Sequence, residues 1–288
     1  MQSVTSLSAL QKTVSQWKQQ GLSVGLVATM GNLHEGHASL VTRAQLLCDK
    51  VVVSIFVNPT QFGEAEDYQG YPRTIEADCE LLDKLSTDLV FMPDEVEVYP
   101  QGHSAGVRLT LPDELENILC GHDRPGHFAG VARVVARLFS MVKPDVAIFG
   151  EKDYQQLLLI RYLTKSLDLP IEIVGAPVIR ETDGLAMSSR NGYLDAGQRA
   201  RAGAIYRVLC QMRDALQAGD NDFPVLEQQA RQQLIEAGLE PDYVSIRRAE
   251  DLQAPSRDHQ SLQLLAAASL GKARLIDNLH VDLAFLDR

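Results

Sequence analysis

The chain has 288 residues, of which 45 % are hydrophobic and 23 % are charged. This length suits one large domain or two ordinary ones, and the composition is typical of a soluble globular protein. A formal net charge of −11 argues against a DNA or RNA partner, because the nucleic-acid backbone usually requires a basic face. The net charge does not exclude a small anionic ligand held in a local basic pocket.

The cysteines and the N-terminus indicate a cytoplasmic protein. Cys48, Cys79, Cys120 and Cys210 are far apart and form no C-x-x-C pair, which predicts reduced thiols. Residues 1–12 lack the basic head and apolar core of a signal peptide, and no apolar run approaches the length of a membrane span. We therefore expect neither export nor a membrane partner.

Strands and helices alternate over the first 178 residues. In chain order we predict a helix at 7–20, a strand at 22–29, a helix at 35–48, a strand at 50–58, a helix at 75–85, strands at 88–92 and 107–111, a helix at 127–142, a strand at 145–149, a helix at 154–163 and a strand at 171–176. The strand at 50–58 is apolar on both faces, as is typical of a parallel strand covered by helices. The alternation predicts an α/β domain with helices on both faces of a parallel sheet.

The pattern changes after residue 178. Two helices, at 196–218 and 223–237, precede three consecutive strands at 243–248, 262–267 and 273–277. Because these strands follow one another without intervening helices, they predict a smaller α+β domain with an antiparallel sheet at 179–288.

Polar segments follow four of the predicted strands of the first domain. They are T-M-G-N-L-H-E-G-H at 29–37, N-P-T-Q-F at 58–62, G-E-K-D-Y at 150–154 and R-E-T-D-G-L-A-M-S-S-R-N at 180–191. In an open parallel sheet, ligands bind at the carboxyl ends of the strands. The four segments together therefore predict a ligand site at this edge.

The histidines of the first segment allow three interpretations. His34 and His37 could begin a metal site, but the zinc-protease pattern H-E-x-x-H fails because residue 38 is alanine. They could lie in a plain loop exposed to solvent. They could also donate to a phosphate at the start of a helix, where Gly31 and Gly36 allow close approach of a ligand.

The other polar segments carry a similar choice between solvated residues and a phosphate site. Lys152 would be unfavourable beside a helix N-terminus unless an anion accompanied it. The stretch M-S-S-R-N-G at 187–192 is either a flexible turn or a mobile phosphate clamp. Gln61 and Gln156 are either surface amides or contacts to hydroxyl and carboxylate groups of a small substrate.

These motifs together resemble a known family. H-E-G-H fits the H-x-G-H signature of nucleotidyl-transferring Rossmann-like enzymes, and M-S-S-R resembles their K-M-S-K-S signature. The fuller set is similar to the pantothenate synthetase (pantoate–β-alanine ligase) family. It comprises T-M-G-x-L-H-E-G-H, V-N-P-T-Q-F, F-G-E-K-D-Y-Q-Q-L, S-S-R-N-G-Y-L and, at 270–278, L-G-x-A-R-L-I-D-N. The matches follow one another in order over nearly the whole chain.

The resemblance implies a ligase that joins pantoate to β-alanine through a pantoyl adenylate, with ATP as substrate and Mg²⁺ bound with it. It implies a Rossmann-like domain at 1–178 that binds ATP and pantoate, a lid domain at 179–288, and a homodimer. The implied catalytic residues are His37, His34 and Lys152. The implied ATP-binding residues are Met30, Gly31, Asn32, Leu33, His34, Glu35, Gly36, His37, Gly150, Glu151, Lys152, Asp153, Ile179, Met187, Ser188, Ser189 and Arg190. Gln61 and Gln156 are implied to bind pantoate, and Asp88 to contact Mg²⁺ indirectly.

The chain departs from the family pattern at three positions without losing a catalytic group. Ala28 stands where the family commonly has proline, and Asn32 where it usually has alanine. Ala129 stands where the family often has a charged residue. The alternative functions are a nucleotidyltransferase for another small acid or phosphate acceptor, a nucleotide-sensing module without turnover, and a zinc protein.

Overall fold

The computed structural model describes residues 1–63, 68–103 and 110–283. The chain forms two compact units. The first unit comprises Met1–Glu116, Arg124–Glu151 and Gln156–Pro177, and the second comprises Asn117–Asp123, Lys152–Gln155 and Val178–Arg288. The main division falls beside the expected limit at 178. Two short segments that the sequence analysis placed in the first domain belong to the second unit.

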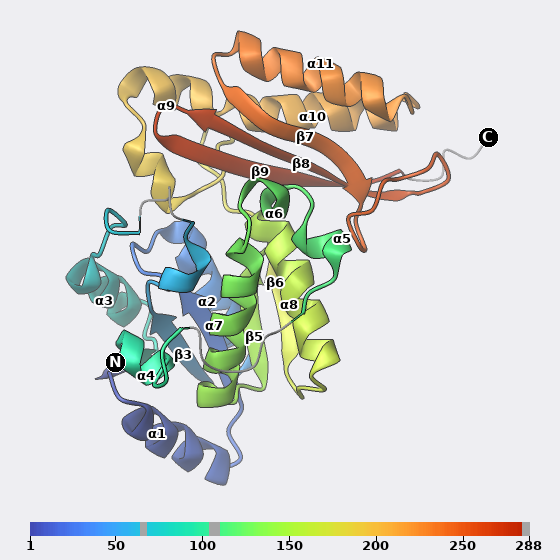
Figure 1. Cartoon of the computed structure of the whole chain (residues 1–288). Helices are drawn as coiled ribbons and strands as arrows, with labels where there is room; N and C mark the ends of the chain where they lie inside the picture. Colours follow the sequence, from blue (N-terminus) through green and yellow to red (C-terminus); the bar gives the residue numbers. More distant parts are fainter. Residues whose placement is uncertain (64–67, 104–109, 284–288) are drawn as a thin grey trace. The chain divides into compact units, whose positions relative to one another are not determined.

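The first unit contains a six-stranded parallel sheet with the order β1-β4-β3-β2-β5-β6. Figure 1 labels β3, β5 and β6 of this sheet. Its strands are β1 (Gln2–Val4), β2 (Val24–Thr29), β3 (Lys50–Ile55), β4 (Leu89–Phe91), β5 (Val146–Gly150) and β6 (Glu172–Ala176). The central strands are almost entirely buried, because helices cover both faces of the sheet. The predicted parallel sheet is confirmed, with β1 as an additional edge strand.

The helices of this unit separate onto the two faces of the sheet. They are α1 (Leu7–Gln19), α2 (Glu35–Leu47), α3 (Ile75–Lys84), α4 (Glu95–Val98), α5 (Asp113–Glu116), α7 (His127–Val142) and α8 (Tyr154–Ser166) from Gln156 onward, with a short 3-10 turn η1 (Pro59–Gln61). Leu40 and Val41 of α2 and Leu82 of α3 form one core with β2 and β3. Helices α1 and α7 contact each other and β2.

The connections change direction at β2. From β2 the chain passes through α2 to β3 on one side, whereas β5 lies on the other side and is reached through α7. The carboxyl ends of β2 and β5 therefore form a topological switch point, which is where open α/β sheets bind ligands. The histidine segment follows β2, and Gly150 ends β5.

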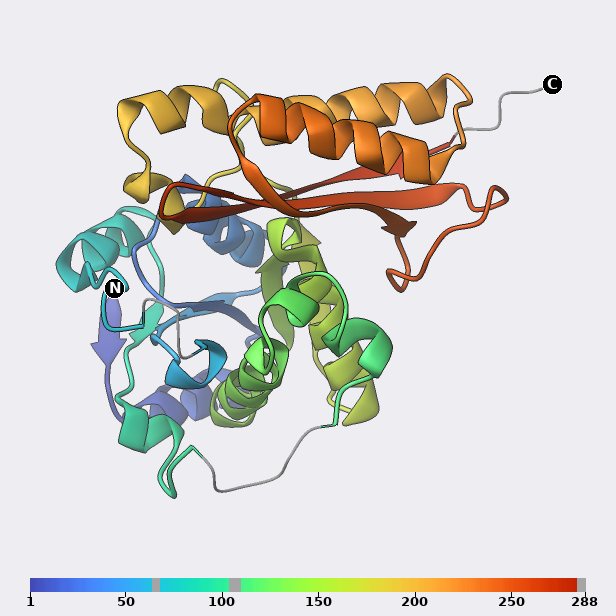
Figure 2. The ribbon, with the colours of Figure 1, turned by 45° about the horizontal axis from the view of Figure 1, so that its top comes forward.

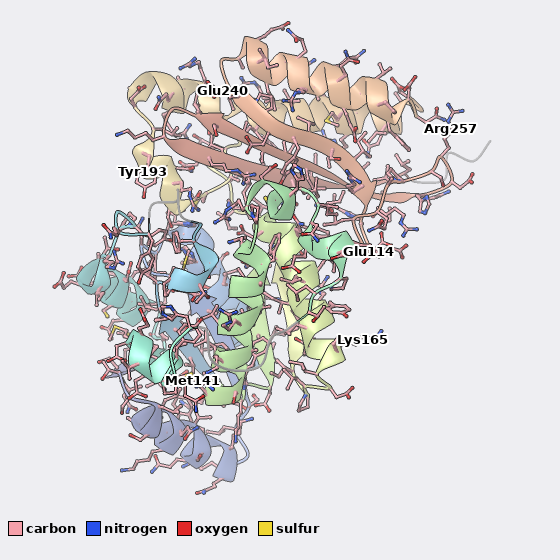
Figure 3. The ribbon with its side chains drawn as sticks, in the orientation of Figure 1. Glu114, Met141, Lys165, Tyr193, Glu240 and Arg257 are labelled. Carbon is pink, nitrogen blue, oxygen red and sulfur yellow. The ribbon has the colours of Figure 1, made fainter. Side chains whose placement is uncertain are left out.

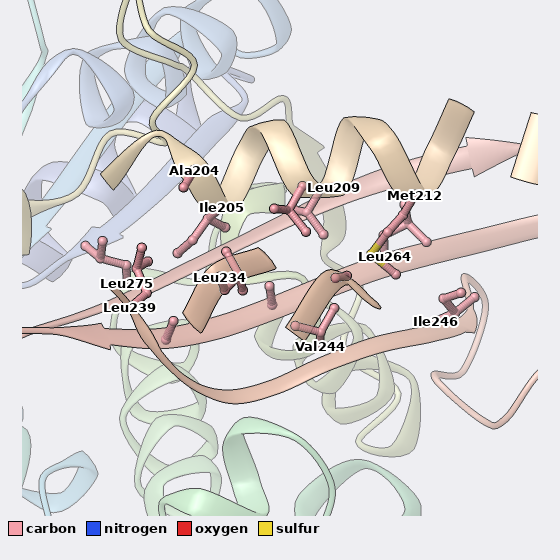
Figure 4. Close-up of a cluster of buried hydrophobic side chains, with 14 of the residues drawn as sticks. Ala204, Ile205, Leu209, Met212, Leu234, Leu239, Val244, Ile246, Leu264 and Leu275 are labelled. Atoms are coloured by element: carbon pink, nitrogen blue, oxygen red, sulfur yellow. The ribbon is translucent and has the colours of Figure 1, made fainter. Parts of the chain in front are cut away.

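The second unit contains an antiparallel sheet in the order β7-β8-β9. Its strands are β7 (Glu240–Arg248), β8 (Ser261–Leu270) and β9 (Ala273–Asp282), and its helices are α6 (Cys120–Asp123), α9 (Ala196–Ala202), α10 (Ala204–Gln217) and α11 (Phe223–Glu236). Figure 2 shows α10 and α11 on the same face of this sheet. These helices and the sheet share a hydrophobic core that includes Ile205, Leu209, Met212, Leu234 and Leu264 (Figure 4).

Most predicted elements are confirmed within a few residues, and two need comment. The helix predicted at 196–218 is two helices, because the chain breaks at Gly203, which ends α9 and precedes α10. The strand predicted at 107–111 falls largely on residues that the structure does not describe. Within the described ranges, no helix has both the length and the apolar character needed to cross a membrane.

Candidate active site

Two histidines cap the start of α2 together. His34 precedes the helix, and its Nδ1 atom accepts the main-chain N–H of Gly36 at 3.1 Å. The Nδ1 atom of His37 accepts the N–H of His34 at 3.3 Å, and the two ring centroids are 4.1 Å apart. This reciprocal cap satisfies two N–H groups that have no partner within the helix.

The cap also determines which ring nitrogen carries the proton. A neutral imidazole has one N–H, and the nitrogen that accepts a hydrogen bond is not the one that carries the proton. Because Nδ1 accepts in both His34 and His37, each neutral ring carries its proton on Nε2. Two Nε2–H donors therefore belong to the first turn of α2, where the helix dipole favours an anion.

Asp78 holds the loop between β2 and α2. Asp78 is 2 % exposed, and its carboxylate accepts the N–H groups of Asn32 and Leu33 at 2.9 and 2.8 Å. Gly31 and Asn32 have φ values of 81° and 52°, in the left-handed region. Hydrogen bonds to a carboxylate are stronger than neutral ones, so Asp78 stabilises this unusual loop. The sequence alone did not predict a role for Asp78.

Gln61 lies against the loop that follows β2. Its Nε2 atom donates to the Sδ atom of Met30 at 3.1 Å, which brings the segments after β2 and β3 together. Asn58 is 1 % exposed and donates from Nδ2 to Oε1 of Gln61 at 3.0 Å and to the carbonyl oxygen of Gly130 at 3.2 Å. Asn58 therefore orients the Gln61 amide, a role that the sequence analysis missed although its motif contains the residue.

Two further groups fix the surroundings of Gln61. The hydroxyl group of Tyr99 donates to Oδ1 of Asn58 at 2.8 Å. Burial raises the pKa of the Tyr99 phenol. The Nδ1 atom of His127 lies 2.8 Å from the main-chain oxygen of Gln61. Both the side chain and the main chain of Gln61 are thus held in place.

The segment after β5 begins with Gly150 and Glu151. The Glu151 side chain packs against Gly175 of β6, where an added Cβ atom would come within 2.8 Å of its Oε1 atom. Lys152 follows in a 3-10 turn, η2 (Glu151–Asp153), directly before α8. Its side chain is 19 % exposed, and its Nζ atom is 3.9 Å from Oδ2 of Asp153. The helix dipole disfavours a cation at the N-terminus of a helix, so the position of Lys152 is more favourable with an anion bound beside it.

The predicted phosphate clamp begins with a short hairpin of the second unit. The N–H group of Met187 donates to the carbonyl oxygen of Ile179 at 2.9 Å, and Arg180 pairs with Ala186 in an antiparallel bridge. These contacts place Ile179 beside the start of the M-S-S-R segment. The sequence predicted both as ATP contacts without predicting that they are hydrogen-bonded to each other.

Arg180 anchors this hairpin. Its guanidinium group donates to both carboxylate oxygens of Asp277, at 2.6 and 2.9 Å, and lies 3.8 Å from the ring centroid of Tyr206. Burial raises the pKa of Asp277, while the hydrogen bonds and charge of Arg180 act to lower it. Such two-point pairing fixes geometry as well as charge. The sequence alone did not predict the pairing of Arg180 with Asp277.

Ser188 shapes the rest of the clamp. Its Oγ atom accepts the N–H group of Arg190 at 3.2 Å and caps a 3-10 turn, η3 (Ser189–Tyr193). Tyr193, labelled in Figure 3, ends this turn and packs against the hydrophobic core of the second unit. Met187, Ser189 and Arg190 are all partly exposed. They therefore remain accessible to a ligand while the ends of the segment are fixed.

The two neighbouring glutamines at the start of α8 differ in their surroundings. Gln155 is 4 % exposed, and its side chain is bound to the main chain at Cys120 and Ile118 at 3.2 and 2.8 Å. Gln156 is half-buried in the first helical turn. Gln155 therefore has a structural role, and Gln156 stays the predicted substrate contact.

The position of Asp88 corrects the predicted magnesium contact. Asp88 precedes β4, and its carboxylate oxygens bind Nζ of Lys50 at 2.7 Å and the N–H group of Val51 at 2.9 Å. Lys50 and Val51 begin β3, so Asp88 lies at the amino ends of the parallel strands. The histidine pair lies at the carboxyl ends, which form the opposite edge of the sheet. Asp88 is thus a structural partner of β3.

The candidate metal ligands do not gather elsewhere either. Within residues 1–63, 68–103 and 110–283, no group of three or more His, Cys, Asp and Glu side chains is arranged to hold a metal ion. In the histidine pair, both Nδ1 atoms already accept main-chain hydrogen bonds. The geometry of this pair suits donation to an anion.

A parallel sheet with histidine donors at its switch point defines the class of Rossmann-like proteins that bind phosphate-bearing ligands. Comparison with known proteins identifies the family within this class. Residues 2–280 match the model of the family described as pantoate-beta-alanine ligase. The chain therefore belongs to the pantoate–β-alanine ligase family, as its motifs predicted.

Individual relatives agree with this assignment. Pantothenate synthetase of Thioalkalivibrio sulfidiphilus is 52 % identical over 98 % of this chain and 99 % of the relative. Pantothenate synthetase of Pseudomonas aeruginosa is 51 % identical over 98 % of this chain and 100 % of the relative.

Solved structures give the same result. Pantothenate synthetase of Thermus thermophilus has a TM-score of 0.91 at 42 % identity, covering 97 % of this chain and 99 % of that one. Pantoate-beta-alanine ligase of Francisella tularensis, complexed with beta-gamma ATP and beta-alanine, has a TM-score of 0.82 at 35 % identity, covering 97 % of each chain. The predicted fold class is thus confirmed.

Proposed function

We propose that this protein condenses pantoate with β-alanine at the expense of ATP, giving pantothenate, AMP and pyrophosphate. The observation that carries the proposal is the reciprocal cap of His34 and His37 at a helix N-terminus, in which each Nδ1 atom accepts a main-chain hydrogen bond. Membership of the pantoate–β-alanine ligase family supports the choice of substrates.

The first step joins pantoate to AMP. A carboxylate oxygen of pantoate attacks the α-phosphorus of ATP, and the bond to the β-phosphate oxygen breaks, so that pyrophosphate leaves with its electron pair. The nucleophile is already an anion and needs no general base. Catalysis consequently depends on positioning and on stabilising the charge that develops on phosphate oxygens.

The site residues divide this work in the proposal. His34 and His37 donate from Nε2 to phosphate oxygens, and Lys152 neutralises charge on the α-phosphate. The segment of Met187, Ser188, Ser189 and Arg190 closes over the phosphates, with Ile179 beside the adenine. Gln61 and Gln156 hold pantoate through its hydroxyl and carboxylate oxygens.

The second step forms the amide. The amine of β-alanine attacks the carbonyl carbon of pantoyl adenylate, the acyl–phosphate bond breaks, and AMP leaves with its electron pair. The nitrogen then loses a proton. Gln61, whose amide is oriented by Asn58, also suits the placement of β-alanine.

The remaining features of the proposal concern the metal and the assembly. Mg²⁺ usually keeps several waters and binds through substrate phosphates, so we place it on the phosphates of ATP, where it would neutralise charge. We also propose a cytoplasmic homodimer in which residues 179–288 act as a lid.

The proposal is tested by supplying ATP, Mg²⁺, pantoate and β-alanine and analysing the products. We expect pantothenate, AMP and pyrophosphate in equal amounts. His37→Ala and Lys152→Ala should each lower the rate of pyrophosphate release by about 100- to 1,000-fold while leaving the circular dichroism spectrum unchanged. Formation of ADP, or near-normal turnover of both variants, contradicts the proposal.

A further inference from the structure

A buried amide of the second unit is bonded to the main chain of Lys152. Asn278, on β9, is 5 % exposed, and its Nδ2 atom donates to the carbonyl oxygen of Lys152 at 2.8 Å. The two residues are 126 positions apart in the chain, so this contact is made only in the folded protein. It acts directly at the residue that we place on the α-phosphate.

The opposite end of the same amide is also fixed. The Oδ1 atom of Asn278 accepts a hydrogen bond from Nε2 of Gln263, on β8, at 2.6 Å. Gln263 is 1 % exposed, and its Oε1 atom lies 3.2 Å from Nδ1 of His280. Because Gln263 donates to Oδ1, the amide nitrogen of Asn278 must face Lys152. The donor is therefore oriented before any ligand arrives.

The main chain of Asn278 takes part in the arrangement that holds Arg180. Its N–H group donates to Oδ1 of Asp277 at 2.7 Å, and its carbonyl oxygen accepts from the Arg180 guanidinium at 3.2 Å. Arg180 in turn is paired with Asp277. Asn278 is thus held on both its side chain and its backbone, which makes it a rigid support.

We propose that Asn278 is a positioning residue for the reaction, which sets the main chain of Lys152 so that its ammonium group meets the α-phosphate. The inference rests on the proposed function of Lys152. Asn278 need not contact a substrate, and it acts through the carbonyl oxygen of Lys152. Displacing a reacting or stabilising group by about 1 Å can lower a rate about 100-fold, so a small change of this support is sufficient.

Asn278→Asp tests the proposal because a carboxylate has nearly the same shape but no N–H donor. The measurement is the single-turnover formation of pantoyl adenylate from ATP, Mg²⁺ and pantoate without β-alanine. The amplitude counts competent sites, whereas the rate constant reports how well the site is positioned. We expect the rate constant to fall about 10- to 100-fold, with an amplitude and a KM for pantoate close to those of the wild type.

Asn221→Asp is the matched control, because it makes the same chemical change at an exposed position before α11 and should keep the wild-type rate. Asn278→Ser, which introduces no charge, must show the same loss of rate if the Asp variant does not fold. A wild-type rate constant in a folded Asn278 variant, or a loss confined to the amplitude, overturns the inference.

Lys152→Ala, measured alongside, separates the two proposals. If Lys152→Ala is slow and the Asn278 variants are not, the inference about Asn278 is wrong. If Lys152→Ala itself has the wild-type rate, or if the wild type forms no adenylate, the proposed function is wrong.

Discussion

His34 combines two roles in one side chain. Its Nδ1 atom caps α2, and its Nε2 atom carries the proton that we assign to phosphate binding. These roles depend on different atoms of the ring, so a substitution can remove one and keep the other. Asn is among the preferred N-cap residues, whereas Ala is not.

We predict that His34→Asn and His34→Ala differ in stability but not in catalysis. His34→Asn keeps an acceptor for the first turn, and so its free energy of unfolding should exceed that of His34→Ala by about 1 kcal/mol. Both variants lack the Nε2–H donor, and both should release pyrophosphate about 100- to 1,000-fold more slowly than the wild type. Urea denaturation and pyrophosphate release are the two measurements. A wild-type rate in the Asn variant would limit His34 to a structural role.

The positions of these residues could be predicted from sequence, but their partners could not. The histidines, Lys152 and Gln61 follow strands, and the carboxyl end of a strand is readable from a local pattern. Asp78 contacts Leu33 across 45 positions, and nothing in the sequence of α3 distinguishes Asp78 from the other carboxylates of that helix. Asp88 also lies next to a strand, but at its amino end. The magnesium contact implied by the family resemblance did not take into account at which end of the strand the residue lies.

At the level of elements, α7 packs directly on the turn that carries Gln61. The contact needs a glycine, because a Cβ atom at Gly130 would lie 2.0 Å from the carbonyl oxygen of Thr60 and 2.7 Å from Cα of Gln61. These are backbone atoms, which cannot rotate away as a flexible side chain would. The spacing between α7 and η1 is therefore set by the absence of a side chain.

We predict that Gly130→Ala both destabilises the protein and weakens pantoate binding. Overpacking of this kind costs about 1–3 kcal/mol, and the displacement of η1 moves Gln61 with it. The KM for pantoate should rise about 10-fold or more, since a small misplacement of a positioning group has large effects. Thermal denaturation and steady-state kinetics measure the two effects.

Gly197→Ala is the control for this prediction. Gly197 lies in α9, and the nearest atom to an added Cβ would be Oδ1 of Asp195 at an ordinary 3.4 Å. Alanine should stabilise this helix by about 0.5–1 kcal/mol without changing the KM. Equal behaviour of the two variants would show that the contact at Gly130 is not restrictive.

Local patterns predicted the types of the elements well, since β-branched runs and helical spacing are local properties. They did not predict where α9 ends and α10 begins, because a single residue, Gly203, separates the two helices and the helical pattern continues across it. The edge strand β1 was missed because it is three residues long and gains its pairing only from β4.

At the level of the whole molecule, the second unit draws on three parts of the chain. The hydroxyl group of Tyr154 donates to the carbonyl oxygen of Ala249 at 2.8 Å, and Tyr243 contacts Sγ of Cys120 at 3.0 Å. Arg274 pairs with Asp123 at 3.1 Å. The sequence predicted a single domain boundary near residue 178, because the order of helical and strand patterns is a local property. It carries no information on these contacts between distant segments.

We predict that residues 178–288 expressed alone do not reproduce the stability of this unit in the full chain. The fragment lacks the 117–123 and 152–155 segments. It therefore loses the contacts that Ala249, Tyr243, Arg274 and Asn278 make with Tyr154, Cys120, Asp123 and Lys152. Four hydrogen-bonded contacts at about 1 kcal/mol each correspond to a melting temperature roughly 15 °C lower for a domain of this size. The melting temperature should fall further if the buried Tyr243 hydroxyl has no hydrogen-bond partner in the fragment.

Differential scanning calorimetry of the fragment and the full chain measures the difference in melting temperature. As a control, Tyr154→Phe in the full chain should lower the free energy of unfolding by only about 1 kcal/mol. A fragment that melts as sharply and as high as the full chain would mean that the two short segments contribute nothing to this fold.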